Sequence, residues 1–479
     1  MNRRMIIYVL GKLLIVLSGL MILPLIISFI YEEELFMSYL IPIVSSFIVG
    51  LLLSIKKPKK KDFFAKDGFI IVGLSWIIIS LIGALPFFIS REIPNFIDAF
   101  FETSSGFSTT GSSILENVET MSKSLLFWRS FTHWVGGMGV LVFVLAILPS
   151  EGRSIHILRA ESPGPQVGKL VSRVNFTARI LYLIYGSMTI IQIILLLFGG
   201  MGLFDSVTHS FATAGTGGFG IKADSIAGYN TYCQIVIGVF MILFGVNFNF
   251  YYLILIKKFK QALKSEEVFW YFGIIIVATC MITTNLYFTT TNSLGVILKD
   301  SFFQVSSIIT TTGFTTVDFS LWHVFSQTVL ILLMFVGACA GSTGGGLKVS
   351  RIIILFKNTF NYLKKLVHPN LVTNVHFEGA KLEEDVVKGV VNYFAVFVII
   401  LFTCILLISI DGNSFTVNFS AALTCLNNVG PGLESIGPSG NFSIFSGFSK
   451  IVLSLAMLIG RLEIFPMLII FSPRTWRNR

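Results

Sequence analysis

The 479-residue sequence predicts an all-α polytopic membrane protein with an N-terminal pair of spans and four units of similar construction. Two observations support this fold class. The composition is 54% hydrophobic with a mean hydropathy of +0.82, and apolar runs long enough to cross a bilayer recur from end to end. Four short glycine motifs also recur along the chain, each after a short apolar segment rich in serine and threonine. A soluble multi-domain protein is therefore excluded.

The first two apolar runs, residues 6–30 and 37–55, are expected to form a peripheral pair of spans. An acidic turn separates them and a basic run beginning at Lys56 follows. The first run is too long for the apolar core of a signal peptide and has no small-residue cleavage site after it. Residues 1–62 are therefore assigned to an N-terminal helix pair without a glycine motif.

The rest of the chain is divided into four units, each with a span, a half-length helix ending in a glycine loop, and a second span. With the first pair this gives ten spans. The units are residues 63–150, 151–262, 263–370 and 371–479. The expected spans within them are residues 67–90 and 124–149, 179–201 and 230–256, 268–289 and 325–356, and 390–410 and 445–472.

The four glycine loops share a small polar residue two positions before the glycine. They are Ser108–Ser112, Thr216–Phe219, Thr310–Phe314 and Asn427–Pro431. In the first three, an aspartate thirteen positions before the glycine (Asp98, Asp205 or Asp300) is expected to lie at the positive start of the helix and cap it; the fourth has Asn418 twelve before. Thirteen helical residues rise about 20 Å, less than the roughly 30 Å of a hydrocarbon core. Each half-length helix is therefore expected to stop partway across the membrane.

Non-helical backbone at membrane depth is tolerated only where it is buried in protein or lines a watery cavity. Units of one topology are related by rotation about the membrane normal, so a pseudo-fourfold arrangement would place the four loops around one axis. Negative helix ends and exposed carbonyls favour a cation there, and glycine permits the backbone angles required. We therefore interpret the units as span, pore helix, filter and span. The alternative, polar surface turns, does not explain why each loop repeats its preceding helix.

Basic residues gather in alternate loops, at residues 56–66, 151–179, 257–264 and 348–365, whereas the loops between them are poor in lysine and arginine. By the positive-inside rule these loops and both termini are expected to be cytoplasmic. The net charge of +10 then faces the cytosol and lipid headgroups, and it does not indicate nucleic-acid binding. Scattered cysteines, and the lack of a nucleophile–base pair or phosphate cradle, argue against an enzyme and against a covalent cofactor.

These loops, together with residues 158–165, 337–351 and 460–466, resemble the Trk/Ktr/HKT superfamily of potassium transporters, and most closely its TrkH-type potassium-translocating subunits. The resemblance covers nearly the whole chain. It implies potassium as the substrate, held mainly by the two residues before each glycine, in a bacterial inner (plasma) membrane. The implied potassium-binding residues are Thr109, Thr110, Gly111, Thr216, Gly217, Gly218, Thr311, Thr312, Gly313, Asn428, Val429 and Gly430. Because the fourth loop lacks threonine, we expect an asymmetric ring. Because each loop has a single glycine step where tetrameric potassium channels repeat a longer signature, we also expect looser discrimination against sodium.

Six consecutive residues interrupt the second span of the third unit: Gly341, Ser342, Thr343, Gly344, Gly345 and Gly346. Each glycine in a helix costs about 1 kcal/mol relative to alanine. One interpretation is close helix packing by small residues. The other, which the resemblance implies, is a movable gate below the filter, in which we include the nearby Lys348.

Arg461 is expected near the middle of the last span, where an unpaired charge costs at least about 2.5 kcal/mol. Glu463 faces another side of the helix and is a poor local partner. Arg461 therefore either forms a buried ion pair with a distant carboxylate or, as the resemblance implies, acts as an electrostatic barrier in the pore. His133 and His209 have no companions at ligand spacing and are expected to be structural histidines.

The loops at residues 150–178 and 357–389 are expected to be solvated connections that contact lipid headgroups. The resemblance adds a homodimer and a separate cytosolic nucleotide-binding regulatory (TrkA-like) subunit. This chain has no dinucleotide-binding fingerprint, so any control by a nucleotide must come from that partner. The expected function is passive, channel-like potassium uptake gated by the intramembrane loop. The alternative is a symporter that couples potassium to sodium or protons.

Overall fold

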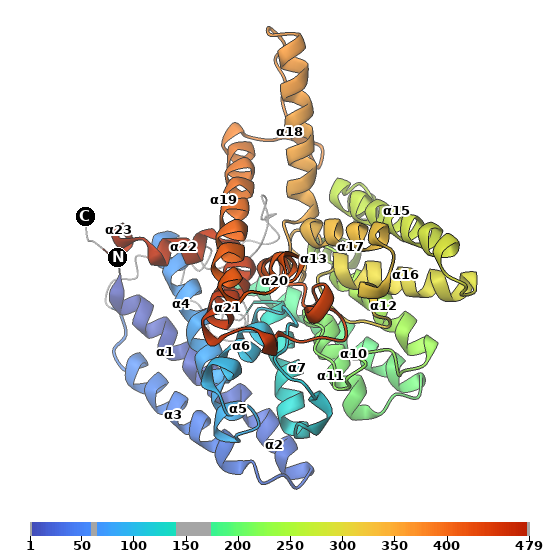
Figure 1. Cartoon of the computed structure of the whole chain (residues 1–479). Helices are drawn as coiled ribbons and strands as arrows, with labels where there is room; N and C mark the ends of the chain where they lie inside the picture. Colours follow the sequence, from blue (N-terminus) through green and yellow to red (C-terminus); the bar gives the residue numbers. More distant parts are fainter. Residues whose placement is uncertain (1, 59–64, 140–173, 477–479) are drawn as a thin grey trace.

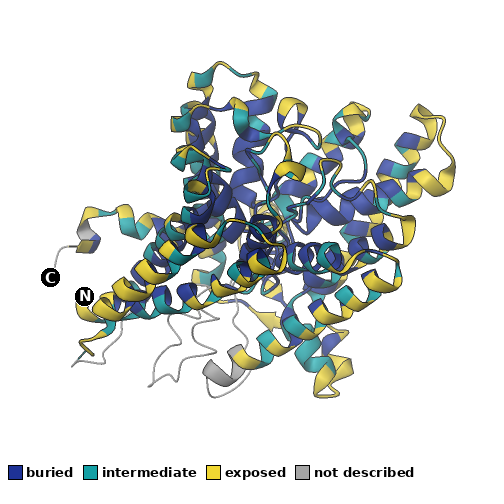
Figure 2. Cartoon of the chain, turned by 90° about the horizontal axis from the view of Figure 1, so that it is seen from below, coloured by how far each residue is buried: buried dark blue, intermediate teal, exposed yellow. Residues whose placement is uncertain are grey.

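The computed structural model describes residues 2–58, 65–139 and 174–476, which are almost entirely helical (Figure 1). The motif at 158–165, the end of the span expected at 124–149 and most of the loop expected at 150–178 lie outside the described residues. Buried residues concentrate at the centre of the molecule, where the short helices meet, and exposed residues cover the outside (Figure 2). The centre is therefore the place to look for a site.

The N-terminal pair consists of α1 (Arg3–Leu20), α2 (Ile22–Ile30) and α3 (Phe36–Ser54). Helices α1 and α3 pack backbone against backbone, because a methyl group built on Gly11 would lie 2.9 Å from the carbonyl oxygen of Gly50. Small residues permit such close approach between helices in a membrane. Large apolar side chains such as Phe47 and Leu52 remain exposed on this pair, as expected of a surface that faces lipid.

The first and second units follow in chain order. The first contains α4 (Ala65–Gly83), α5 (Leu85–Ile89), α6 (Phe96–Phe107), η1 (Val118–Thr120) and α7 (Lys123–Gly137). The described part of the second contains α10 (Val174–Phe198), α11 (Leu203–Gly215), α12 (Thr231–Phe244), α13 (Phe248–Leu255) and α14 (Phe259–Ala262).

The third and fourth units complete the chain. The third contains α15 (Glu266–Thr289), α16 (Leu294–Ile309), η2 (Phe319–Leu321), α17 (Val324–Val336) and α18 (Val349–Val367). The fourth contains β1 (His376–Phe377), β2 (Ala380–Lys381), α19 (Glu384–Ile408), η3 (Ser409–Asp411), α20 (Phe415–Asn427), η4 (Glu434–Ile436), η5 (Phe442–Ile444), α21 (Gly447–Arg461), α22 (Phe465–Phe471) and α23 (Pro473–Trp476). Strands β1 and β2 form one antiparallel hairpin.

Six described helices are long and apolar enough to cross a membrane, or up to seven if one bent pair counts as a span. They are Arg3–Ile30, Phe36–Ser54, Lys66–Ile89, Arg179–Phe198, Glu266–Thr289 and Glu384–Asp411. These helices match the N-terminal pair and the first span of every unit.

The second spans of the last three units are bent or broken, an interruption that was expected only in the third unit. Helices α12 and α13 meet at 89°, residues 337–348 separate α17 from α18, and a short break separates α21 from α22. In the first unit α7 already ends at Gly137. The physical reason is visible at the last break, where Glu463 and Ile464 have φ of 55° and 66°, which no α-helix accommodates.

Four short helices, α6, α11, α16 and α20, precede the glycine loops and are 12 to 16 residues long. The expected helix starts need correction. Asp98 and Asp205 lie in first turns, but α16 begins at Leu294, so Asp300 lies farther inside it. The side-chain caps come from Asn95 and Ser414 instead of the aspartates, because only these side chains accept from the first free N–H groups.

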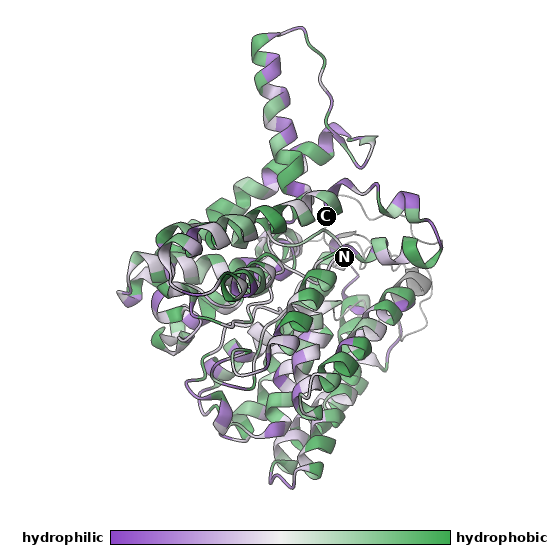
Figure 3. Ribbon diagram, turned by 90° about the vertical axis from the view of Figure 1, so that its right-hand side faces the viewer, coloured by the Kyte–Doolittle hydropathy of each residue, from purple (hydrophilic) through white to green (hydrophobic). Residues whose placement is uncertain are grey.

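Helix α18 continues to Val367 and projects from the helical body (Figures 1 and 3), with hydrophobic and hydrophilic residues mixed along its length. Beyond it, Val375, Phe377 and Leu382 of the hairpin segment are buried in the main core. Most of the connection at 357–389 is exposed, as expected, but the segment also contributes a helix end and a hairpin anchored in the core.

Candidate ion pathway

The four short helices end in one and the same turn. The residue two positions before each loop glycine adopts a left-handed conformation, with φ between 55° and 57°. The N–H of the following residue donates to the carbonyl five residues earlier at 2.8 to 2.9 Å. This pair of features is the Schellman ending of a helix, which usually uses glycine at the left-handed position. Here the left-handed residues are Thr109, Thr216, Thr311 and Asn428.

A threonine in this conformation costs about 1–2 kcal/mol relative to glycine. Strain of this kind persists where the surrounding structure holds it, and it concentrates at functional sites. The residue one position before each glycine does not have a positive φ, whereas the glycine itself does. The sign of φ therefore alternates along each loop, which turns successive peptide groups toward one side.

The four loops meet in a closed ring. A methyl group built on each loop glycine would collide with a carbonyl oxygen of the next loop, and the fourth loop returns to the first. The distance from the added methyl carbon to the carbonyl oxygen is 2.0 Å from Gly111 to Gly217 and 2.0 Å from Gly218 to Thr312. It is 2.3 Å from Gly313 to Val429 and 2.8 Å from Gly430 to Thr110. The twelve predicted filter residues are thus brought together, and their glycines leave no room for a side chain.

On one side of this ring lies a polar cavity of about 190 Å³ that is lined by all four loop glycines. Among the described residues, no group of three or more His, Cys, Asp or Glu side chains could hold a metal ion. The oxygens that the ring offers to a cation are therefore peptide carbonyls and hydroxyl groups, which suit a weakly held monovalent ion.

Side-chain contacts differ around the ring. In the first and third loops, two hydroxyls pair, Ser108 with Thr110 at 2.7 Å and Thr310 with Thr312 at 2.8 Å. In the fourth loop, the Asn428 Nδ2 donates to Thr110 Oγ1 and to the Met457 carbonyl, both at 2.9 Å. The ring is therefore asymmetric in its supporting hydrogen bonds.

A buried ion pair, which the sequence analysis missed, lies behind the first two loops. Glu102 of α6 accepts from Arg129 Nε of α7 at 2.8 Å and from the N–H of Ile114 at 3.0 Å. Arg129, whose side chain is only 3% exposed, donates to the carbonyl of Gly220 at 3.2 Å. The pair therefore fixes the exits of both loops. Its signal in the sequence was a carboxylate inside a half-length helix, where charge is costly.

His133 has a structural role, as expected. Its Nδ1 lies 2.7 Å from the carbonyl oxygen of Gly106, and its Nε2 accepts from the N–H of Phe219 at 3.3 Å. His209 bonds the Asp205 carbonyl one turn earlier in α11 at 2.7 Å. His133 therefore joins α6 to the second glycine loop.

The segment 337–348 forms a closed loop. At its neck the N–H groups of Leu347, Lys348 and Val349 donate back to the carbonyls of residues 335–338 at 3.0 to 3.2 Å. Its tip contacts the ring, because the N–H of Gly345 donates to Thr311 Oγ1 at 2.6 Å and that of Gly346 to the Asn427 carbonyl at 3.0 Å. We call this segment the intramembrane loop.

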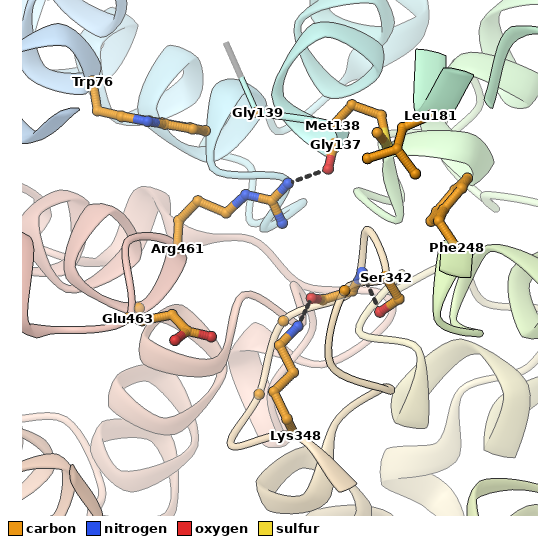
Figure 4. Close-up of a pocket in the computed structure, with 15 residues that line it drawn as sticks. Trp76, Gly137, Met138, Gly139, Leu181, Phe248, Ser342, Lys348, Arg461 and Glu463 are labelled. Carbon is orange, nitrogen blue, oxygen red and sulfur yellow. Dashed lines mark hydrogen bonds between the residues drawn. The ribbon is translucent and has the colours of Figure 1, made fainter. Parts of the chain in front are cut away.

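Arg461 holds the tip from a second direction. Its Nη1 donates to the Thr343 carbonyl at 2.7 Å, and its Nη2 donates to the carbonyls of Gly136 and Gly137 at 2.5 and 2.6 Å. Figure 4 shows the guanidinium reaching toward the end of α7. Glu463 pairs instead with Arg351. The guanidinium thus joins the intramembrane loop to the end of another helix.

A cavity of about 100 Å³ lies at this loop (Figure 4). Seven of the eight predicted gate residues line it, Gly341, Ser342, Gly344, Gly345, Gly346, Lys348 and Arg461. Thr343 does not, because its N–H and Oγ1 both donate to the carbonyl of Phe244, at the break between α12 and α13. Lys348 Nζ donates to the Gly344 carbonyl. One cavity thus lies at the ring of glycine loops and the other at the intramembrane loop.

Comparison with known proteins adds a family to this geometry. Residues 37–299 and 272–478 match the family model TrkH, described as a cation transport protein. The chain is 35% identical over 486 residues to the Trk system potassium uptake protein TrkH of Escherichia coli (strain K12), with 100% of both chains covered. It is 31% identical over 482 residues to the Trk system potassium uptake protein TrkG of the same strain, with 99% of both covered.

Among solved structures, the chain is similar to the crystal structure of the potassium transporter TrkH from Vibrio parahaemolyticus. The TM-score is 0.89 at 32% sequence identity, and the match covers 100% of both chains. The similarity therefore extends over the whole length of both chains.

Proposed function

Because the chain belongs to the TrkH family of cation transport proteins, whose members are not enzymes, we propose that it takes up potassium across the bacterial inner membrane through the ring of four loops. The observation that supports this most strongly is the closed cycle of glycine contacts, in which every loop touches the next. A cation that enters this ring exchanges water for peptide oxygens. The potassium-binding residues are the twelve that form the loops.

In this proposal an N-terminal helix pair precedes four units, each made of a span, a pore helix, a filter and a second span. The four units are related by pseudo-fourfold symmetry. The chain then has ten spans, and both termini are cytoplasmic. The six apolar helices of spanning length support the first span of each unit. The four helices that share one Schellman ending support the rotational relation between the units.

In this proposal the intramembrane loop is the gate. Its tip forms hydrogen bonds with Thr311 and Asn427. The tip therefore obstructs the path of an ion on the side of the ring where the pore helices end. Arg461 adds a positive charge there, and a cation passing this point would meet both a steric and an electrostatic obstacle. Opening requires the tip bonds to break.

The proposed partners follow the family resemblance: a second copy of the chain, membrane lipid, and a cytosolic nucleotide-binding regulatory (TrkA-like) subunit. Helix α18 supports a docking role on the cytoplasmic side, because it projects from the body with Phe356, Phe360, Leu363 and Val367 exposed. Lys364 and Lys365, exposed in the last turn of the same helix, suit anionic headgroups beside it.

The test is growth of a potassium-uptake-deficient bacterium at low external potassium. The native chain should restore growth, whereas Gly111→Ser and Gly313→Ser should not, since either side chain would meet a neighbouring carbonyl. Gly186→Ser is the matched control, because a methyl group at Gly186 meets nothing within 4 Å. Growth supported by both filter variants would refute the proposed pathway.

Flux into liposomes with potassium as the only permeant metal cation distinguishes the two transport mechanisms. We propose passive flow, so uptake should persist without sodium and without a proton gradient. A symporter should stall under the same conditions.

A further inference from the structure

A buried carboxylate holds the neck of the intramembrane loop. Glu267 lies in the first turn of α15 and is 3% exposed. Its Oε1 accepts from the N–H of Ala340 at 2.7 Å and from the N–H of Ser350 at 3.1 Å. These two donors lie on opposite arms of the loop, one near its beginning and one in the first turn of α18. One oxygen atom therefore joins both arms.

The chemistry of this contact is strong. Ser350 provides one of the N–H groups at the start of α18 for which the helix itself has no acceptor. This end of the helix also attracts a negative charge. Hydrogen bonds to an ionised carboxylate are about twice as strong as neutral ones. Glu267 thus stabilises the closed neck, although it touches neither the tip nor the ring.

The start of α15 is held in turn by the hairpin β1–β2. Glu378 lies in the turn between the strands, and its Oε1 accepts from the backbone N–H of Glu267 at 3.0 Å and from Ser265 Oγ at 2.9 Å. The other side of the hairpin is tied to α18, because Lys357 Nζ donates to the His376 carbonyl at 2.8 Å and also pairs with Glu266. A continuous set of contacts runs from the exposed turn of the hairpin to the loop neck.

We propose that Glu267 is the positioning residue of the intramembrane loop and that the hairpin controls the loop through it. The inference rests on the proposed gating role of the loop. In the closed state Glu378 fixes the start of α15, and Glu267 keeps both arms together so that Gly345 reaches the ring. A partner that draws the hairpin away removes the Glu378 contacts, which loosens the neck and lets the tip withdraw.

The experiment compares three variants of the full chain in liposomes. Glu267→Gln keeps the size of the side chain and removes its charge, and Glu378→Gln does the same at an exposed residue of the hairpin. Asp385→Asn is the control, because Asp385 is an exposed carboxylate in the first turn of α19. Loss of a charge-assisted bond should raise potassium flux about fivefold for Glu267→Gln and about twofold for Glu378→Gln, with no change for Asp385→Asn.

Amide hydrogen exchange supplies a readout that does not depend on transport. The N–H groups of Ala340 and Ser350 should exchange faster in both glutamine variants and at the native rate in the control. Because both changes act through one contact, the double variant should not exceed Glu267→Gln in flux. Unchanged flux or unchanged exchange in Glu267→Gln overturns the inference.

A shortened loop that lacks Gly344–Gly346 separates this inference from the gate itself. If the shortened chain conducts more than the native chain but Glu267→Gln does not, only the role of Glu267 fails. If the shortened chain conducts no more than the native chain, the proposed gate fails as well.

Discussion

The ring and the intramembrane loop are both glycine-bearing, non-helical backbone at the centre of the molecule, yet they are held differently. Each loop of the ring is fixed by its own helix through the same two backbone bonds. The intramembrane loop has backbone bonds at its neck, but it is also held by side chains from other elements, Glu267 of α15, Arg461 of α21 and Thr311 of the third glycine loop. Hydrogen bonds between residues close in the sequence make the ring rigid, whereas hydrogen bonds from distant side chains can be released. The difference indicates which part moves.

The contrast between a rigid ring and a releasable loop requires that the ring depend on its buried ion pair. Arg129→Met leaves the Glu102 carboxylate buried and uncompensated, so the protein should lose about 3–5 kcal/mol of stability and most of its potassium uptake. Thermal unfolding in detergent and uptake in cells measure the two effects. Lys388→Met is the control, because its i,i+4 pair with Glu384 is exposed to solvent and its loss should leave the unfolding temperature unchanged. Native stability in Arg129→Met would contradict a rigid ring.

The same change, glycine to alanine, should have opposite effects in the two regions. A methyl group at Gly345 would lie 2.3 Å from the Asn427 carbonyl. Because the ring is fixed and the loop is not, the loop should yield, and potassium flux into liposomes should rise about tenfold, the equivalent of about 1.4 kcal/mol. Gly389→Ala, whose methyl group meets nothing within 4 Å, is the control. A fall in flux would indicate that the ring gives way first.

Substitutions of Arg461 separate its charge from its hydrogen bonds. Arg461→Gln removes the charge, so flux should rise about fivefold, whereas Arg461→Lys keeps the charge and should change flux less than twofold. If the two variants conduct equally, the bonds to Thr343, Gly136 and Gly137 matter and the charge does not. Flux at two ionic strengths provides the check, because a charge effect weakens with salt.

The smallest expected effect concerns asymmetry within the ring. Asn428→Ala removes the bond to Thr110 Oγ1 that ties the fourth loop to the first. Losing this bond together with the bond to the Met457 carbonyl should lower the preference for potassium over sodium about threefold. Competitive uptake of the two ions measures it. Thr403→Ala, which loses only a bond within α19, should leave the preference unchanged.

The sequence was sufficient to predict the half-length helices, the recurrence of the loops and the interruption at Gly341, because each leaves a mark in spacing or composition. It could not reveal the breaks near Gly245 and Glu463. The first appears as the 89° angle between α12 and α13, and the second as the positive φ of Glu463 and Ile464. The polar residues there, such as Asn247 and Glu463, do not by themselves specify a bend.

The sequence also did not reveal which residues hold the site in place. Glu102 and Arg129 are 27 positions apart, and Glu267 bonds to residues 73 and 83 positions away. Pairings over such separations have no local signature. Threonine at the left-handed position of a helix ending is likewise hidden, because glycine is the residue that usually marks it.

The most direct test of the central claim is anomalous diffraction from crystals of the protein grown with rubidium or thallium in place of potassium. The account predicts ion density on the axis enclosed by Gly111, Gly218, Gly313 and Gly430, with carbonyl oxygens of all four loops around it. Ion density that lies beside a single loop, or outside the ring altogether, would contradict it.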